Sequence, residues 1–271
     1  MTGSHNPVNP HSSSEFAEIA ERFTILRCLV GSGVHGTAVE GQDDRDEMGL
    51  CIEPPEYVIG LRGFEQYVFR TQPEGARSGA GDLDLTVYSL RKWMRLALSG
   101  NPTVLLPLFV PDRDIVTITA LGEDLRSRPE MIVSRQAGKR FLGYLRAQRD
   151  DLLGRSAGRH GTRPELVEAH GFDTKFAMHM VRLGVQGVEL METGRITLPI
   201  AEPWLAWLRE LRQGQRSRQE ALEAAEELEH RLEALADSSP LPERPQTDEA
   251  ERWLIDAYRE TWAGSGPGAL S

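Results

Sequence analysis

The chain has 271 residues, of which 39% are apolar and 27% are charged, and its formal net charge at pH 7 is −10. This composition is typical of a globular protein with one large or two small domains, and it excludes a chain disordered throughout. The acidic balance argues against indiscriminate coating of nucleic acid. No apolar run reaches the roughly 18 residues that cross a bilayer, and the N-terminus has no secretory signal. We therefore predict a cytoplasmic protein with no membrane partner, whose Cys28 and Cys51 are reduced.

Charge is distributed unevenly along the sequence. Eight basic residues and only two acidic ones lie between positions 134 and 163, whereas positions 218–260 hold 13 acidic and five basic residues. The simpler interpretation is that both stretches are solvated helix faces. The alternative is that the central basic stretch faces an anionic ligand.

Hydrophobic patterning divides the chain into a strand-rich first part and a helical second part. After a segment expected to be disordered at 1–14 and a short helix at 15–22, the pattern predicts strands at 23–30, 46–53, 65–70 and 82–88, with a glycine-rich turn at 31–36. Helical periodicity follows at 89–99, with Ser89 as N-cap, and at 135–153, 173–193, 202–213, 217–236 and 248–262. We therefore predict an α+β fold: an α/β domain at 15–130, a helical domain at 131–262 and a flexible tail at 263–271.

The glycine-rich turn has two interpretations. GSGVHG at 31–36 matches G-x-G-x-x-G and follows a strand, which is the pattern of a dinucleotide-binding fold. The next residues, TAVEGQDDRDEMG, leave no room for the crossover helix that this fold needs. The favoured interpretation is that backbone N–H groups and the Ser32 hydroxyl approach a phosphate.

Two pairs of aspartates point to a metal site. Asp44 and Asp46 enter a strand at positions i and i+2, so their side chains lie on one side, roughly 6.5–7 Å apart. Carboxylates so placed can bridge two divalent cations about 3.5–4 Å apart. Asp82 and Asp84 form a similar pair in a later strand, where Asp is disfavoured. Taken by themselves, Asp82 and Asp84 fit the solvent face of an edge strand, but together with the Gly-Ser turn and the Asp44–Asp46 pair they predict metal binding.

These motifs resemble the DNA polymerase β nucleotidyltransferase superfamily. Three segments are similar to its RNA-ligase-associated branch, a group linked to RNA repair: GSGVHGTAVEGQDDRDEMG, DLTVYSLRKWMRLALSGNPTVLLPLF and HGFDTKFAMHMVRL. The similarity extends from about residue 23 to residue 199. Asp84 rather than Asp82 aligns with the second segment. The resemblance implies a small mixed-sheet module, similar to the polymerase β palm, followed by a helical module.

The resemblance also implies roles for individual residues. Gly31 and Ser32 would hold the β- and γ-phosphates of an NTP substrate, and Asp44 and Asp46 would hold two ions of Mg²⁺ or Mn²⁺. Asp84 would complete the catalytic metal site and help to deprotonate the attacking hydroxyl. These three aspartates are the candidate catalytic residues.

A cationic helix face provides further nucleotide-binding candidates. Lys175, His179 and Arg182 recur at i, i+4 and i+7, so they share one face of a helix that Asp173 is expected to cap. Such a face can clamp a triphosphate or an acceptor phosphate. The alternative is a solvated polar stripe.

Four other residues are weaker candidates. Tyr144 and Phe172 have rings that could stack on a base, although a core position is the favoured interpretation of both. Lys92 is expected to be exposed. Asn101 is expected to end a helix rather than to touch substrate.

The predicted reaction is transfer of a nucleoside monophosphate from an NTP to a hydroxyl, with an RNA end as the acceptor and pyrophosphate as the leaving group. One alternative keeps this chemistry but takes a protein hydroxyl, as in AMPylation, or a small molecule as the acceptor. A second alternative is a non-catalytic module that binds nucleotide or RNA.

Overall fold

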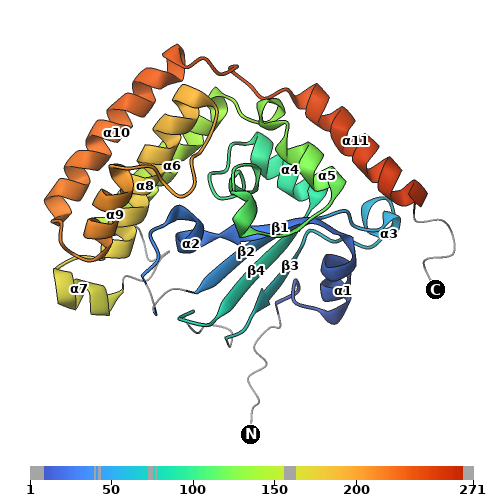
Figure 1. The fold of residues 1–271 in the computed structure, drawn as a ribbon, viewed down its shortest axis with the longest axis horizontal. Helices are drawn as coiled ribbons and strands as arrows, with labels where there is room; N and C mark the ends of the chain where they lie inside the picture. The colour runs from blue at the N-terminus through green and yellow to red at the C-terminus, as the bar shows by residue number, and fades with distance from the viewer. Residues whose placement is uncertain are drawn as a thin grey trace, which may run out of the picture.

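The computed structural model describes residues 9–39, 41, 44–72, 76, 78–155 and 163–264. Its centre is a five-stranded mixed sheet with the strand order β3-β4-β2-β1-β5 (Figure 1). Strands β2 and β4 are parallel, and the other neighbouring pairs are antiparallel. The strand bounds are Thr24–Val30 (β1), Arg45–Cys51 (β2), Gln66–Arg70 (β3), Leu83–Ser89 (β4) and Ile115–Ile118 (β5).

The register of the central strands brings the acidic positions together. In the antiparallel pair of β1 and β2, Val30 lies opposite Asp46. In the parallel pair of β2 and β4, Asp46 lies opposite Asp84. Because side chains alternate along a strand, Met48 and Leu50 share the Asp46 face of β2 and are buried in the main core. The sheet therefore presents its aspartates at the end of a face that is otherwise packed.

Short helices pack around this sheet. Helices α4 (Leu90–Leu98) and α5 (Ala120–Arg126) lie on one face, and α1 (Ser14–Phe23) lies on the other (Figure 1). The chain forms α2 (Gly31–His35) directly after β1, and α3 (Pro55–Val58) follows β2. Ser89 caps α4 as predicted, since its hydroxyl accepts a hydrogen bond from the backbone N–H of Lys92.

The second part of the chain is a group of packed helices: α6 (Arg135–Leu152), α7 (Pro164–His170), α8 (Thr174–Thr193), α9 (Trp204–Arg212) and α10 (Arg218–Ser238). Fourteen of the 20 residues of α8 are buried. Glycines allow this close packing, because a Cβ on Gly184 would lie 2.8 Å from Leu228 of α10, and one on Gly187 would lie 2.8 Å from Phe141 of α6.

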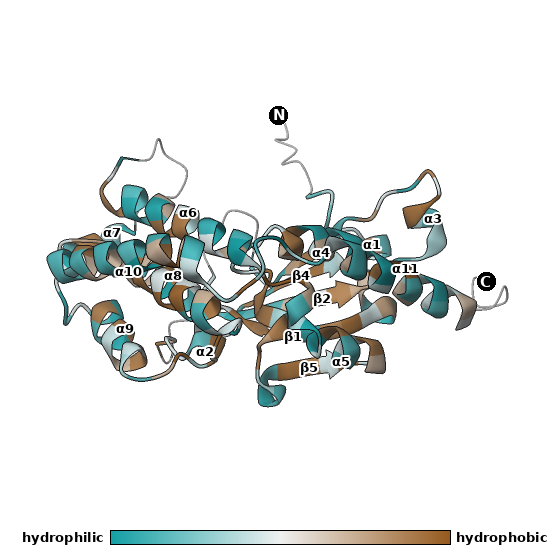
Figure 2. Ribbon diagram, turned by 90° about the horizontal axis from the view of Figure 1, so that it is seen from above, coloured by the Kyte–Doolittle hydropathy of each residue, from teal (hydrophilic) through white to brown (hydrophobic). Residues whose placement is uncertain are grey.

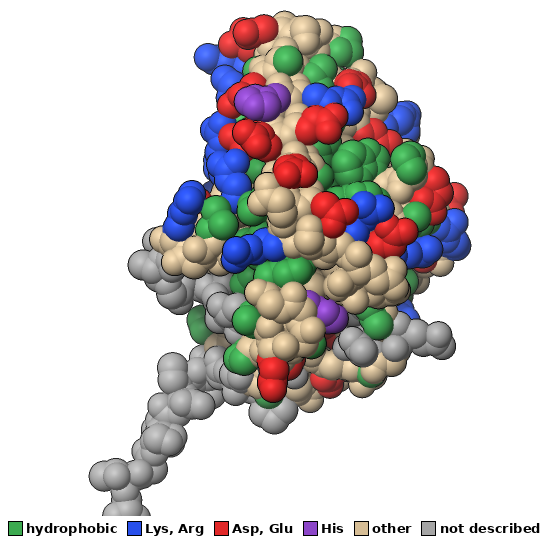
Figure 3. Space-filling view, turned by 90° about the vertical axis from the view of Figure 1, so that its left-hand side faces the viewer, with side chains coloured by type: hydrophobic (Ala, Val, Ile, Leu, Met, Phe, Trp, Pro, Cys, Tyr) green, Lys and Arg blue, Asp and Glu red, His purple; other side chains and the backbone are tan. Residues whose placement is uncertain are grey.

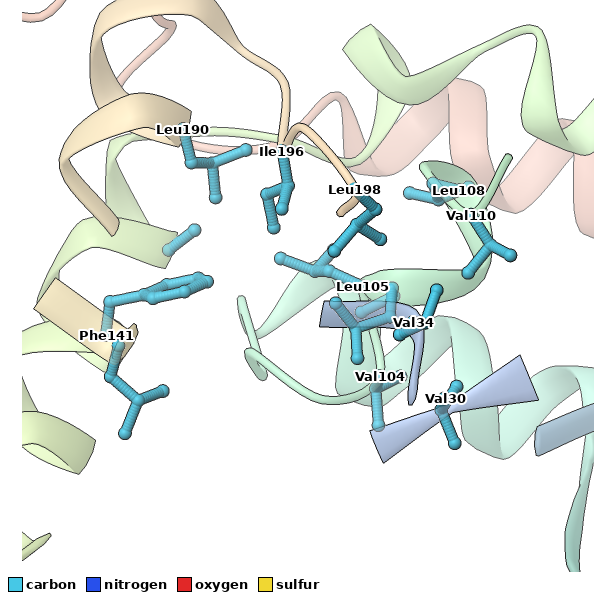
Figure 4. Packing of buried hydrophobic residues seen from close by; sticks show 14 of the residues in the cluster. Val30, Val34, Val104, Leu105, Leu108, Val110, Phe141, Leu190, Ile196 and Leu198 are labelled. Atoms are coloured by element: carbon cyan, nitrogen blue, oxygen red, sulfur yellow. The ribbon is translucent and has the colours of Figure 1, made fainter. Parts of the chain in front are cut away.

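One apolar core joins the sheet to the helices. Figure 4 shows Val34 and Leu105 on the sheet side close to Leu198, with Phe141 and Leu190 on the helical side. Figure 2 shows that β1 is largely apolar, whereas α10 is largely hydrophilic. Among the described residues, no helix is both long and apolar enough to cross a membrane.

The last helix, α11 (Thr247–Gly264), returns to the sheet module and lies along α4. The Tyr258 hydroxyl donates to Glu53 Oε2 at 2.7 Å, and Trp262 Nε1 donates to the Glu53 carbonyl at 3.1 Å. The domain boundaries at 15–130 and 131–262 stay a prediction.

Most predicted elements are present within a few residues of the expected bounds, and the α+β class is confirmed. Residues 31–35, predicted as part of a turn, form the short helix α2, and strand β5 was not predicted. Residues 9–13 are part of the segment expected to be disordered; there the carbonyl of His11 accepts a hydrogen bond from Val68 of β3 at 2.9 Å. Residues 1–8 and 265–271 lie outside the described residues. Cys28 and Cys51 are buried and free, as expected.

The central basic stretch does not form one continuous anion-binding face. Arg146 and Arg149 of α6 form ion pairs with Glu229 of α10, and Arg146 also pairs with Glu233 at 2.6 Å. Figure 3 shows basic and acidic side chains interspersed on this side of the molecule. Two of the eight basic residues of this stretch, Arg146 and Arg149, are therefore used to join α6 to α10; Arg159 lies outside the described residues.

Candidate active site

Three of the predicted aspartates converge at the edge of the sheet face. One carboxylate oxygen each from Asp44, Asp46 and Asp84 lies within 4.8 Å of the other two, and all three residues are partly buried. The cause is the strand pairing, because β2 places Asp46 beside Asp84 of β4 while Asp44 directly precedes β2.

The first residue of α2 lies against this cluster. Gly31 has a φ of +71°, a conformation that side-chain-bearing residues rarely adopt. A Cβ at this position would lie 2.0 Å from Asp46 Oδ2. Glycine therefore allows the start of α2 and the Asp46 carboxylate to be in direct contact.

Asp84 is oriented by three neighbours. Its Oδ1 accepts hydrogen bonds from Arg70 Nε and Gln72 Nε2, both at 2.9 Å, and its Oδ2 accepts one from Ser78 Oγ at 2.7 Å. Burial raises the pKa of the Asp84 carboxyl, but the hydrogen bonds from Arg70, Ser78 and Gln72 outweigh it and bring the pKa below its ordinary value. The side chain thus stays ionised, as a metal ligand must.

Asp82, the alternative third carboxylate, has another structural role. Its Oδ1 accepts a hydrogen bond from the Thr71 hydroxyl, and its Oδ2 accepts one from the Gly79 N–H, both at 2.9 Å. It closes the turn before β4 and is not part of the acidic cluster found among the described residues.

A pocket of about 280 Å³ opens beside Asp44 and Asp46, between α2 and α8. Its lining includes every predicted nucleotide-binding residue: Gly31, Ser32, Lys175, His179 and Arg182. The structure therefore brings residues about 140 positions apart into one cavity. Asp84 does not line this pocket, because it lies on the other side of the acidic cluster.

The α8 side of the pocket carries a buried guanidinium. Arg182 Nη1 donates to Gln186 Oε1 at 3.1 Å and contacts His35 Nε2 of α2. Arg182 Nε is inaccessible to solvent and has no hydrogen-bond partner among the residues that the structure describes. Burial lowers the Arg182 pKa to about 10. Because unpartnered buried donors are costly, this donor is a feature that a bound anion would satisfy.

A second cation is placed by the cap of α8. As predicted, Asp173 caps this helix, accepting hydrogen bonds from the backbone N–H groups of Lys175 at 3.0 Å and Phe176 at 3.1 Å. Its other carboxylate oxygen accepts from Arg163 Nη1 at 3.2 Å, and the Arg163 guanidinium lies 5.3 Å from the centre of the Phe176 ring. These contacts hold Arg163 in the pocket lining.

The pocket electrostatics favour an anion. Burial, reinforced by the charges of Arg182 and Lys175, holds the pKa of His179 well below its ordinary value. Burial together with the Arg182 charge does the same to His35. Both imidazoles are therefore neutral at pH 7, and the positive charge belongs to Arg163, Lys175 and Arg182.

Sequence reasoning did not assign a site role to five residues that line the pocket: His35, Thr37, Thr103, Leu106 and Arg163. His35 lies within the GSGVHG motif, three residues after Ser32, so its spacing along α2 was a usable signal. Thr103 belongs to the loop after α4, and nothing in its local sequence relates it to residues 31–46.

The cluster fits a divalent cation. Three carboxylate oxygens within 4.8 Å of one another can together hold a divalent cation, and carboxylate oxygens are the ligands that Mg²⁺ and Mn²⁺ prefer. The direct contact of Gly31 with Asp46 shows that the backbone is shaped around a carboxylate in this position. Acidic residues of this kind beside a cation-lined pocket are the hallmark of metal-dependent phosphate-transfer proteins.

The sequence matches the RNA repair pathway DNA polymerase beta family, RlaP, over residues 8–256. The match covers nearly the whole chain, and the protein belongs to this family of the polymerase β superfamily. Its fold is thus that of a nucleotidyltransferase-like family, as the sequence motifs predicted.

Two other comparisons add little. A solved nucleotidyltransferase-like protein from Exiguobacterium sibiricum is 14% identical in sequence; the alignment covers 90% of this chain and 77% of that one, with a TM-score of 0.29. At that TM-score the likeness supports no conclusion, so the assignment depends on the family match. No curated protein matches the sequence.

Proposed function

We propose that this protein transfers a nucleoside monophosphate from an NTP to the hydroxyl of an RNA end. The observation that carries the proposal is the placement of Asp44 and Asp46 between a cationic pocket on one side and Asp84 on the other. One side of the carboxylates can receive a triphosphate, and the other can receive an acceptor. The RNA repair family supports RNA as that acceptor.

The chain's own residues would bind and orient the nucleotide. Ser32 and the start of α2 face the phosphates, while Lys175 and Arg182 approach from α8. Arg182 Nε would gain a hydrogen-bond partner, which none of the described residues supplies. Fixed donors of this kind stabilise charge that develops on the leaving pyrophosphate.

The aspartates would hold the metal. Asp44 and Asp46 would share two ions of Mg²⁺ or Mn²⁺, and Asp84 would complete the site nearer the acceptor. Bound divalent ions neutralise phosphate charge and lower the pKa of a coordinated hydroxyl. In the overall reaction the acceptor oxygen bonds to the α-phosphorus, the bond to the bridging oxygen breaks, and pyrophosphate leaves as the hydroxyl proton is lost.

Incorporation of label from each α-³²P NTP into short single-stranded RNA, with Mg²⁺ or Mn²⁺, tests the proposal. The wild type should label RNA, whereas Asp44→Asn/Asp46→Asn should not. The matched control is Asp248→Asn/Asp256→Asn, which removes two exposed carboxylates of α11. This control should behave as the wild type does.

The alternatives give different results. Label that appears on protein would indicate AMPylation, and label on a small molecule would indicate a different acceptor class. Nucleotide binding without any transfer would indicate a non-catalytic module. Each of these results would contradict RNA as the acceptor.

A further inference from the structure

A partly exposed strip of the sheet leads away from Asp84 along β4. Along β4, Asp84, Thr86 and Tyr88 point to the same face, and each is partly exposed. In the neighbouring strand β3, Arg70 pairs with Asp84 and Gln66 pairs with Tyr88. Because a strand rises about 3.3 Å per residue, Tyr88 lies about 13 Å from Asp84 along this strip.

The far end of the strip combines two aromatic rings with a cation. Lys92 Nζ lies 5.8 Å from the centre of the Tyr88 ring and donates to Gln66 Oε1 at 3.0 Å. Tyr144 of α6 is 41% exposed, which corrects the expectation that it belongs to the core; Phe172, by contrast, is buried as expected. Burial, with a smaller contribution from Tyr144, raises the pKa of the Tyr88 hydroxyl.

A single loop connects this end with the nucleotide pocket. Asn101 Oδ1 accepts hydrogen bonds from the N–H groups of Thr103 and Val104, so Asn101 shapes the loop that ends α4, as predicted. Its Nδ2 donates to the Tyr144 hydroxyl at 3.3 Å. Thr103 in the same loop lines the nucleotide pocket. The strip and the pocket are therefore adjacent features of one site.

Positive side chains outnumber acidic ones around the strip, although the chain as a whole is acidic. Lys92 and Arg95 lie at the aromatic end, the exposed Arg140 lies one turn before Tyr144 on α6, and Arg70 pairs with Asp84 at the other end. Glu65 is the acidic residue near Lys92 and Arg95, at 3.6 Å from Lys92 and 3.3 Å from Arg95. Cations interleaved with accessible aromatic rings are typical of surfaces that bind single-stranded nucleic acid without strong sequence preference.

We propose that the strip from Asp84 to Tyr88 and Tyr144 is the track that binds the single-stranded end of the acceptor RNA. The proposal rests on the proposed function, because Asp84 marks where the reacting hydroxyl would lie. At about 3.4 Å per stacked nucleotide, the 13 Å span corresponds to roughly four nucleotides. Tyr144 and Tyr88 would therefore contact bases about four positions from the reacting end, and Lys92 would contact the backbone.

The test is equilibrium binding of fluorescently labelled single-stranded RNA of three and eight nucleotides, followed by anisotropy without NTP. The wild type should bind the octamer more tightly than the trimer. Tyr144→Ala should weaken octamer binding about 5–20-fold, as expected for loss of one stacked base, with little effect on the trimer. Tyr144→Phe keeps the ring and should bind within about twofold of the wild type.

Charge on the strip has its own control. Lys92→Gln should weaken octamer binding and reduce its dependence on salt, because a phosphate contact is lost. Arg259→Gln removes an equally positive charge from an exposed position of α11 and should leave binding unchanged. Circular dichroism of each variant establishes that it is folded.

The proposal is overturned if Tyr144→Ala binds the octamer as tightly as the wild type does, or if it loses trimer and octamer binding equally. Binding to RNA does not require catalysis, so the two proposals can fail separately. If RNA binding depends on length but no label is transferred, the proposed reaction is contradicted and the proposed RNA track is still supported. If the wild type binds no RNA but transfers label to protein, the proposed RNA track is overturned and the nucleotidyl-transfer chemistry is still supported.

Discussion

The contact between Gly31 and Asp46 predicts that Gly31→Ala disturbs the candidate metal site. In Gly31→Ala the new Cβ would lie 2.0 Å from Asp46 Oδ2, whereas real contacts of this kind are at least about 3.0 Å long. The carboxylate, or the start of α2, must therefore move by about 1 Å. A residue with a side chain at a φ of +71° also costs about 1–2 kcal/mol of stability.

Stability and activity should respond very differently to this substitution. A loss of 1–2 kcal/mol leaves a domain of ordinary stability folded at 25 °C. A displacement of about 1 Å in a catalytic constellation, by contrast, can lower the rate about 100-fold. We expect Gly31→Ala to unfold at slightly lower urea concentration and to lose about 100-fold in kcat for nucleotide transfer.

Gly33→Ala is the matched control, since it lies two residues further along the same helix. A Cβ there meets nothing within 4 Å, and Gly33 has no left-handed backbone conformation. This variant should retain its activity and gain up to about 1 kcal/mol in stability. Equal activity of Gly31→Ala and Gly33→Ala would refute the argument that Asp46 must be in this position.

Three further substitutions test other parts of the site and fold. Asp84→Asn should lower kcat for label incorporation at least about 100-fold, whereas Asp82→Asn, which affects only a turn, should remain within about threefold of the wild type. Arg182→Gln removes a charged hydrogen-bond donor from the pocket and should raise KM for NTP about 10–100-fold in the same assay. Glu53→Gln tests a buried carboxyl whose pKa is raised, chiefly by burial. The raised pKa means that the folded state favours the protonated form, so the Glu53 contribution to stability is full below about pH 4.5 and is lost as pH rises through the folded value. The variant should therefore be more stable than the wild type at pH 7 in urea unfolding, and the difference should shrink toward pH 4.5.

Each of these three predictions has a result that would contradict it. Equal kcat values for Asp82→Asn and Asp84→Asn would show that Asp84 contributes no more to catalysis than Asp82 does. An unchanged KM in Arg182→Gln would mean that the pocket on α8 does not bind the triphosphate. A stability difference for Glu53→Gln that does not vary with pH would show that the Glu53 carboxyl has the same pKa in the folded and unfolded states.

The sequence was informative wherever a local pattern determines the structure. Strand alternation and helix periodicity predicted β1, β2 and most of the long helices, because each buries one side of a regular repeat. The spacing of Asp44 and Asp46, read with Gly31 and Ser32, indicated the carboxylate cluster. Strand pairing then decided which later aspartate joins it, since Asp84 lies opposite Asp46 in the register.

Features set by distant contacts could not be predicted in this way. Strand β5 has only four residues, and two of its side chains are exposed, so its sequence carries no alternating pattern. Arg163 is directed by Asp173, and the Tyr144 hydroxyl accepts a hydrogen bond from Asn101, which is 43 positions away in the sequence. The pairing of Arg146 with α10 likewise depends on how two helices pack, which no window of the sequence contains.

A crystal structure with Mn²⁺ and a non-hydrolysable NTP analogue tests the central claim most directly. The account predicts anomalous peaks for Mn²⁺ among the carboxylates of Asp44, Asp46 and Asp84, with the triphosphate over Ser32 and within hydrogen-bond distance of Arg182. Peaks elsewhere, or a nucleotide bound outside this pocket at saturating concentration, would contradict it.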